Sequence, residues 1–307
     1  MPAVLVLLAG CGAAAPPGLP GDAMVATGNE GGVFVTIGRE LARAVPVADG
    51  TVSVVRTDGS VANLVRLTGG SADVGFSLAD TAEAAFGGTG PFEAPQPVCA
   101  LARLYDSYVQ VVVRADSGVT RFDGLRGRRI AIGSAESGSA LVANRLLDAA
   151  GLVPGRDVRT VHADLAAATA ALEAGGIDAM IWLGGLPTAA VADLAARVPL
   201  ALVDLDGVTT ALDDRYDDVY RPSTVPASVY GTPAPVRTLS ITNYLMASTA
   251  MPPDEVRAWL GALFSERVAG SHREAERLNP RTAIGTGSIP LCAGAAEAYR
   301  ELGRGDR

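Results

Sequence analysis

The hydrophobic and polar positions of this chain follow two alternating periods along most of its length. Short apolar runs indicate strands, and segments in which apolar side chains recur every three to four positions indicate helices. From Asp22 the predicted order is strand, helix, strand, helix, strand, over residues 22–28, 31–45, 51–59, 60–70 and 72–78. Ser60 is the predicted N-cap of the second helix, and Gly69 is its predicted stop.

A second series of alternating segments begins near residue 108. We predict strands within residues 108–119, 122–133, 158–163, 177–184 and 237–248, and helices within residues 137–152, 164–176, 187–198 and 252–270. Such alternation is typical of α/β layers built on largely parallel sheets. We therefore predict two α/β lobes with a cleft between them.

Two glycine-rich turns each connect a predicted strand to a predicted helix: GNEGGVF at residues 28–34 and GSAESGSA at residues 133–140. At such a turn the first N–H groups of the helix have no intrahelical partner, and the helix dipole favours an anion. We expect the turns to face each other across the cleft and to hold a carboxylate or a phosphate. A plain turn without a ligand is the alternative for each. Neither turn has the dinucleotide-binding Gly-x-Gly-x-x-Gly or the Gly-x-Ser-x-Gly nucleophile elbow.

The first 21 residues, MPAVLVLLAGCGAAAPPGLPG, combine a short apolar run with a tail of small residues. This segment resembles a bacterial lipoprotein signal, and its LAGC matches the lipobox, whose cysteine is lipidated; here that residue is Cys11. The alternative is a buried strand of a cytoplasmic protein. No other segment reaches about 18 uninterrupted apolar residues, the length that a transmembrane helix needs.

Composition removes several function classes. At 49% hydrophobic and 19% charged residues, the 307-residue chain can bury a large core. Its net charge of −8 argues against nucleic acid as a partner. All 25 basic residues are arginines, which excludes a P-loop or Schiff-base lysine, and the two histidines and three widely spaced cysteines match no zinc motif. We expect no metal and no cofactor.

The order and spacing of five segments resemble the TAXI-type solute-binding proteins, the extracytoplasmic receptors of TRAP transporters. The segments are ATGNEGGVFVTIGRELA, TDGSVANLVRLTGGSADVGFSLAD, GLRGRRIAIGSAESGSALVANRLLDAAGL, ALEAGGIDAMIWLGGLPTAAVADLA and IPLCAGAAEAYRELG. The first is similar to the family's Thr-Gly-Gly-Thr-Gly-Gly-Val-Tyr-Tyr opening, and the likeness extends over more than 250 residues. The chain departs from the family's usual residues at Phe34, Leu78, Ala79, Glu136, Ser139 and Cys292.

The resemblance implies a type II periplasmic-binding fold, in which crossing strands join two α/β lobes that hold a small solute. We expect residues 1–21 to be a signal and tether, residues 22–112 and 248–307 to form lobe I, and residues 113–247 to form lobe II. Family members with known ligands favour glutamate, glutamine or related organic acids. The implied function is a lipid-anchored extracytoplasmic receptor that closes on an organic acid or amino acid and delivers it to the TRAP membrane permease without catalysis.

The segments that carry the resemblance also supply the candidate ligand-binding residues. They are Gly31, Gly32, Val33, Phe34, Ser60, Asn63, Asp80, Glu136, Ser137, Gly138, Ser139, Trp182, Gly184 and Tyr230. Several have structural alternatives. Ser137, Ser60 and Asn63 could serve only as helix caps, and Asp80 is favoured as the cap of the next helix. Trp182 could be a pocket wall or a core residue, and Tyr230 a ligand contact or part of a turn.

Further residues have candidate roles outside this set. Arg66 and Arg114 are candidate carboxylate clamps, and Cys99 and Cys292 a candidate disulfide. Glu136 could repel an acid or bind the ammonium of an amino acid. Two other functions stay open: an enzyme on a similar scaffold, using Glu30, Glu136 or Asp80 as acid or base, and a ligand sensor without transport.

Overall fold

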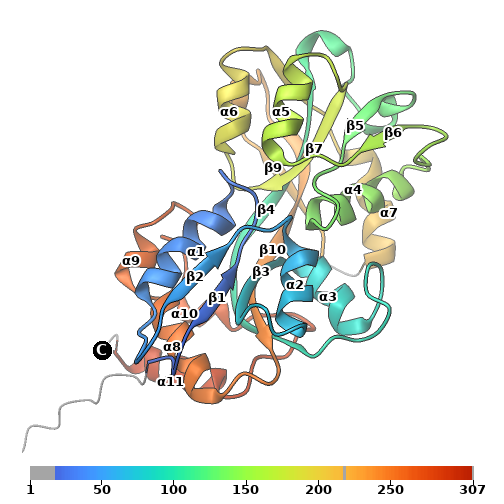
Figure 1. Cartoon of the computed structure of the whole chain (residues 1–307). Coiled ribbons are helices and arrows are strands. Elements are labelled where there is room, and N and C mark those ends of the chain that lie inside the picture. The colour runs from blue at the N-terminus through green and yellow to red at the C-terminus, as the bar shows by residue number, and fades with distance from the viewer. Residues whose placement is uncertain (1–17, 217–218, 306–307) are drawn as a thin grey trace, which may run out of the picture.

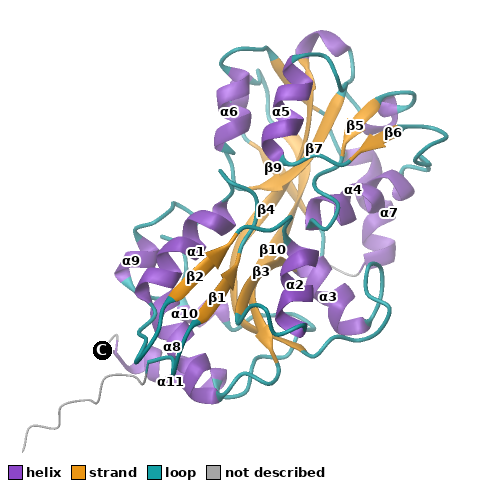
Figure 2. Cartoon of the chain, in the orientation of Figure 1, coloured by secondary structure: helices purple, strands orange, loops and turns teal. Residues whose placement is uncertain are grey.

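Two long strands, β4 (Val98–Arg114) and β10 (Val236–Ser248), run antiparallel through the centre of the molecule and join its two lobes (Figure 1). The computed structural model describes residues 18–216 and 219–305, so the predicted lipidation site at Cys11 lies outside the described residues. In each lobe, helices cover a layer of strands (Figure 2). The α/β fold class predicted from the sequence is confirmed.

Lobe I contains both ends of the described chain. Its strands are parallel and lie in the order β2, β1, β3. The strands are β1 (Ala23–Ala26), β2 (Val52–Val55) and β3 (Val74–Leu78). The helices are α1 (Val33–Ala44), α2 (Ser60–Thr68), α3 (Ala79–Gly87), α8 (Pro253–Leu263), α9 (Glu266–Ala269), α10 (Pro280–Ala283) and α11 (Ala295–Gly305).

Lobe II is formed by the middle of the chain. Its parallel strands lie in the order β7, β5, β6, while β8 pairs with β4 and β9 pairs with β10. The strands are β5 (Arg129–Ala131), β6 (Arg159–Val161), β7 (Ala179–Gly184), β8 (Leu200–Leu202) and β9 (Arg221–Val225). The helices are α4 (Gly138–Ala149), α5 (Leu165–Glu173), α6 (Ala189–Ala195) and α7 (Asp206–Tyr216), with 3₁₀ turns at Ala115–Ser117, Phe122–Leu125 and Val229–Gly231.

The long strands change partners where one lobe gives way to the other. β4 pairs with β10 from Val98 to Tyr108 and with β7 from Tyr108 to Val113. β10 pairs with β9 up to Ser240 and with β3 from Asn243. The boundaries predicted from the sequence, after residues 112 and 247, therefore fall at the ends of these strands and not where their partners change, and the division stays a prediction.

Helix α1 illustrates how the sequence pattern produces the packing. Its apolar face buries Ile37 and Leu41 completely against the sheet of lobe I. Gly38 lies on the same face, where a Cβ atom would be only 2.5 Å from Cγ2 of Thr27. The glycine lets the helix lie close to β1, and that contact fixes the direction in which the start of α1 points.

Three local predictions were wrong. Ser60 is the first residue of α2 and not its cap, because its Oγ accepts the N–H of Leu78 (3.0 Å). Asp80 lies inside the first turn of α3 and makes no cap. The helix predicted over residues 252–270 ends at Leu263, because Ser265 turns the chain and caps α9 with its own side chain.

The candidate disulfide is confirmed. Cys99, near the start of β4, is bonded to Cys292, just before α11, with 4.9 Å between their Cα atoms. The bond therefore lies within lobe I and ties its C-terminal helices to the sheet. Among the described residues, no helix has the length and apolarity that crossing a bilayer requires.

Candidate functional site

A cavity of about 120 Å³ lies between the lobes beside β4. An apolar cavity of about 150 Å³ holds one benzene molecule, so the space suits a small ligand. Its walls include the turns that precede α1 and α2 in lobe I, and α4 and α6 in lobe II. Both glycine-rich turns predicted as ligand cradles, residues 28–34 and 133–140, contribute to this wall.

The lobes touch each other closely at one side of this cavity. The N–H of Ala62 in lobe I donates to the carbonyl of Glu136 in lobe II (3.1 Å). A Cβ atom on Gly138 would lie 2.5 Å from Cδ1 of Leu78 and 2.7 Å from Oγ of Ser60. Any side chain here would therefore force Leu78 and Ser60 to shift, and the glycine lets the start of α4 lie against the start of α2.

Ser137 is the N-cap of α4, as its position in the sequence allowed. Its Oγ accepts the N–H of Ala140 (3.0 Å) and donates to the carbonyl of Ser134 (2.7 Å). Its own N–H also donates to that carbonyl (3.1 Å). Ser137 therefore shapes the turn, and its polar groups are already engaged.

The next residues supply the donors that face the cavity. The N–H groups of Gly138 and Ser139, at the start of α4, make no hydrogen bond with other described residues. Oγ of Ser139 accepts the N–H of Leu183 (3.3 Å), and Oγ of Ser60 accepts that of Leu78 (3.0 Å), so each hydroxyl keeps its hydrogen for another acceptor. Donors of this kind, at helix starts, suit a carboxylate.

Aromatic side chains form another part of the wall. Phe34 stacks on Phe76 with 5.1 Å between ring centroids and meets Tyr105 edge-on at 6.5 Å. Tyr105 and Trp182 are buried, at 8% and 9% exposure, and both line the cavity. Nε1 of Trp182 has no hydrogen-bond partner among the described residues. Most of the surface of this wall is therefore apolar, but it also presents hydrogen-bond donors.

Charges around the cavity are few and mostly negative. Within the described residues, the cavity lining contains no arginine; its ionisable members are Asp58, His272 and Tyr105. Asp58 is exposed, whereas Glu274, which pairs with Nε of Arg273 (3.4 Å), is buried behind the lining. Burial, and then the charge of Glu274, raise the pKa of Tyr105 well above its usual value, so its hydroxyl stays protonated and can donate.

Comparison with known proteins agrees with this architecture. The sequence profile of the NMT1-like family matches residues 25–303. The chain belongs to this family. The alkanesulfonate-binding protein SsuA from Xanthomonas axonopodis pv. citri, bound to MOPS, is 17% identical with a TM-score of 0.52 over 94% of this chain and 85% of that one. MatC from Rhodopseudomonas palustris, with bound malate, is 15% identical with a TM-score of 0.55 over 92% and 97%. These likenesses show the fold of periplasmic solute-binding proteins.

Most of the residues predicted from the sequence line the cavity of this NMT1-like protein. They are Gly31, Gly32, Val33, Phe34, Ser60, Ser137, Gly138, Ser139, Trp182 and Gly184. They come from both lobes and from segments that are far apart in the chain. The structure therefore brings the two predicted cradles together at one site.

Asn63 and Tyr230 do not line the cavity. Nδ2 of Asn63 donates to the carbonyls of Thr27 (2.5 Å) and Phe76 (2.8 Å), so the amide ties α2 to the residue after β1 and to the middle of β3. The hydroxyl of Tyr230 donates to Oε1 of Gln110 (2.6 Å) and accepts the N–H of Thr188 (2.6 Å). The polar groups of both side chains are hydrogen-bonded to other residues of the protein. Both side chains support the cavity wall from behind.

Asp80 and Glu136 also lie elsewhere. Asp80 is buried between the lobes, where it contacts Tyr220 and Arg145. Glu136 lines a separate, open hollow on the surface. Glu30, the third carboxylate considered for an enzyme, is exposed and paired with Arg39 (2.8 Å). All three carboxylates that the enzyme hypothesis used as acid or base therefore lie outside the cavity lining.

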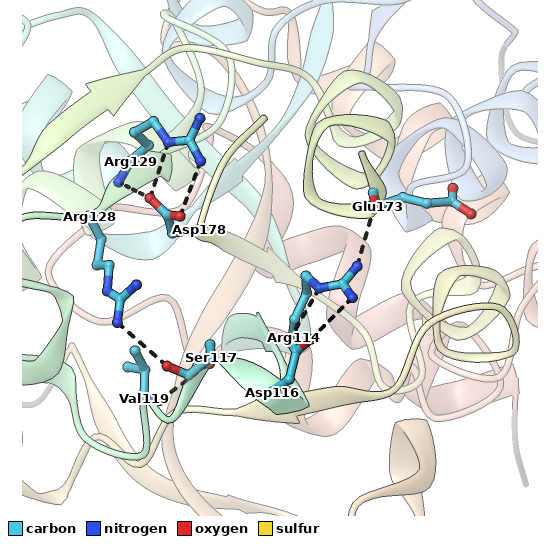
Figure 3. Close-up of polar contacts among 8 residues, drawn as sticks. All are labelled: Arg114, Asp116, Ser117, Val119, Arg128, Arg129, Glu173 and Asp178. Carbon is cyan, nitrogen blue, oxygen red and sulfur yellow. Dashed lines mark hydrogen bonds and ion pairs between the residues drawn. The ribbon is translucent and has the colours of Figure 1, made fainter. Parts of the chain in front are cut away.

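The candidate arginine clamps were misplaced as well. Arg114 pairs with Asp116 (3.3 Å) and donates to the carbonyl of Glu173 (3.4 Å) on lobe II (Figure 3). Arg66 lines the same open hollow as Glu136. His162 contacts the carbonyl of Gly133 (3.2 Å) through Nδ1. None of these side chains contributes to the cavity lining.

The sequence prediction missed several lining residues, among them Asp58, Tyr105, Gly185, Thr188 and His272. Gly185 and Thr188 belong to the segment GGLPT, which begins at the last residue of β7 and precedes α6, so its glycines gave the same signal as the two turns that were recognised. Tyr105 lies in the middle of a strand of 17 residues, where nothing in the pattern marks it. Among the described residues, no three His, Cys, Asp or Glu side chains gather closely enough to hold a metal ion.

Proposed function

We propose that this protein is an extracytoplasmic receptor that captures a small carboxylate-bearing solute between its lobes and passes it to a TRAP-type permease. One observation carries the proposal: the starts of α1, α2 and α4, from both lobes, meet at one cavity whose described lining contains no arginine. Backbone N–H groups and hydroxyls can hold a single carboxylate there without a cationic side chain. Malate and MOPS, bound by the two compared proteins, each carry an anionic group, a carboxylate or a sulfonate.

Closure of the lobes would couple binding to delivery. The ligand would contact donors of lobe I, at Ser60, and of lobe II, at Gly138 and Ser139. Contacts from both lobes exist only when the lobes are together, so the ligand binds the closed form more tightly and shifts the population toward it. This is a binding cycle in which no covalent bond changes.

A thermal-shift screen of C4 to C6 organic acids and amino acids tests the ligand class. At a ligand concentration 100 times Kd, binding stabilises the native state by about 2.7 kcal/mol, which is on the order of 5 °C in a protein of this size. We expect at least one acid to produce such a shift. If sugars or metal cations shift the melting temperature and every acid fails, the proposal is wrong.

A matched pair of serine substitutions locates the site. Ser139→Ala removes a hydroxyl that lines the cavity and accepts the N–H of Leu183 at 3.3 Å. Ser117→Ala removes one that accepts the N–H of Val119 at the same distance, on the surface of lobe II (Figure 3). Titration calorimetry should show about three- to tenfold weaker acid binding for the first variant, the value of one hydrogen bond, and unchanged binding for the second.

Export and partnership are tested separately. If Cys11 is lipidated, Cys11→Ser should release the protein from the membrane fraction and remove the lipid mass from its N-terminal peptide. We expect genes beside this one to encode the membrane subunits of a TRAP transporter. A neighbouring signalling gene in their place would instead favour a sensor that reports ligand without transport.

A further inference from the structure

The indole N–H of Trp182 is a hydrogen-bond donor that the protein leaves without a partner. The side chain is 9% exposed, and no described acceptor lies within reach of Nε1. A buried donor without a partner costs about 1–3 kcal/mol, so native structures rarely keep one without reason. Trp182 lines the cavity, and a ligand there can supply the missing acceptor.

Gly184 leaves the approach to this N–H open. A Cβ atom on Gly184 would lie 2.8 Å from Nε1 of Trp182 and would cover it. Gly184 itself lines the cavity, and its φ is not in the left-handed region, so the backbone does not require a glycine here. The close approach to the indole is what excludes a side chain at this position.

Tyr105 offers a second neutral donor from the other lobe. It lies on β4 within the part of the strand that pairs in lobe I, lines the cavity, and is 8% exposed. Its hydroxyl makes no hydrogen bond with the described residues, in contrast to the hydroxyl of Tyr230, which makes two. Trp182 and Tyr105 therefore present one unused donor each, from lobe II and lobe I.

The surrounding charges do not suit a second carboxylate at these donors. Glu274 raises the pKa of Tyr105 and so acts on the same part of the cavity, and its carboxylate would be 2.7 Å from a Cβ atom on Gly185. The nearby cation, Arg273, is already paired with Glu274 (3.4 Å). Nδ1 of His272 accepts the N–H of Glu274 (3.2 Å) and lies 3.9 Å from the carboxylate of the same residue.

From these contacts we infer that the cavity selects a monocarboxylate whose other end carries a neutral acceptor, such as an amide, keto or hydroxyl oxygen, read by Trp182 and Tyr105. This inference rests on the proposed function and names its ligand class more closely. A dicarboxylate of the same length would place its second charge beside neutral donors and near Glu274, where like charges repel.

Pairs of ligands that differ only by an amide in place of a carboxylate test this directly. Titration calorimetry of the purified protein would compare succinamate with succinate and glutamine with glutamate. We expect the amide of at least one pair to bind about tenfold more tightly than the acid. Equal binding, or tighter binding of the acid in both pairs, overturns the inference and leaves the receptor function intact.

Two tryptophan variants assign the effect to one N–H group. Trp182→Phe keeps an aromatic wall but removes the donor, and should weaken amide binding about three- to tenfold with little change in acid binding. Trp259→Phe is the matched control, because Nε1 of Trp259 is also buried without a partner but lies in the core of lobe I, away from the cavity. It should change neither affinity.

Other outcomes separate this inference from the proposed function. If Trp182→Phe weakens the amide and the acid equally, Trp182 is only a wall and the inference is wrong. If other acids bind but neither member of either pair does, the inference alone fails. If no acid binds at all, the proposed function fails and the inference fails with it.

Discussion

Among the described residues, two contacts between the lobes have opposite character. At the cavity, the contacts are made by glycine turns and neutral donors, several of which have no protein partner. Beside α3 and α4, the contact is a buried charged cluster formed by Asp80 of lobe I with Arg145 and Tyr220 of lobe II. In the cluster each of these polar side chains has a hydrogen-bond or ion-pair partner. At the cavity, by contrast, several donors have no acceptor among the described residues.

The side chains of the cluster bond to one another. The Tyr220 hydroxyl donates to Asp80 (2.9 Å), Nη1 of Arg145 donates to that hydroxyl (2.9 Å), and the guanidinium lies 4.2 Å from the centre of the Tyr216 ring. Burial raises the pKa of Asp80, and the charge of Arg145 opposes that rise. Of the polar groups that lie between the lobes, only those without a partner in the protein therefore indicate a binding site.

The largest effect should come from breaking the cluster. Asp80 has a side chain that is 0% exposed, so Asp80→Ala leaves Arg145 with an uncompensated charge in a largely buried position. Breaking such a pair costs about 3–5 kcal/mol, which urea denaturation would measure. Asp116→Ala breaks an exposed pair with Arg114 (Figure 3) and should leave the free energy of unfolding nearly unchanged.

Removal of both charges sharpens this result. The double variant Asp80→Ala with Arg145→Met leaves no buried charge unpaired and should recover part of the lost stability. If the double variant is as unstable as the sum of the single variants, the ion pair is not what holds this contact together.

Opening the disulfide should have the next largest effect on stability. Cys99 and Cys292 are 193 residues apart in sequence, and cross-links over long loops typically contribute about 2–4 kcal/mol. Because the bond lies within lobe I, thermal denaturation after reduction should show a lower melting temperature, while ligand affinity at 25 °C stays the same. A loss of affinity would show that lobe I depends on the bond for the shape of the cavity.

A methyl group added where the lobes touch beside the cavity should lower ligand affinity more than it lowers stability. Gly138→Ala places a methyl group 2.5 Å from Cδ1 of Leu78, so either Leu78 moves or the lobes separate, and affinity should fall about tenfold or more. Gly261→Ala in α8 is the control, since a Cβ atom there meets nothing within 4 Å and alanine favours the helix. Equal affinities for the two variants would mean that this contact is unimportant for binding.

The smallest effect concerns pH and lies outside both contacts. The hydrogen bond from Arg156, with the N–H of Val153 next, lowers the pKa of Asp157 from 3.8 to about 2. Its contribution to stability is therefore present above pH 3.8 and is lost as the pH falls through about 2. Between pH 4 and pH 2, the unfolding free energy of wild type should fall more steeply than that of Asp157→Asn. Parallel curves would contradict this assignment.

The sequence predicted the framework of the site better than its details. Periodicity located β1, α1, β3 and α4, and the glycines of two turns located two walls of the cavity, because these signals are local. The role of Asp80 could not be read in this way, since its partners lie 65 and 140 residues away. An aspartate at a strand end has the same local sequence whether it binds a ligand or an arginine from another lobe.

The order of the strands affects how the molecule can assemble. In the sheet, β10 lies between β3 and β4, although it is made long after both of them. A chain that emerges from the N-terminus onward cannot complete lobe I until the residues of β10 have followed, while all of lobe II is made in between. The first lobe to begin is thus the last to finish, and a chain cut short before β10 would lack the strand that lies between β3 and β4.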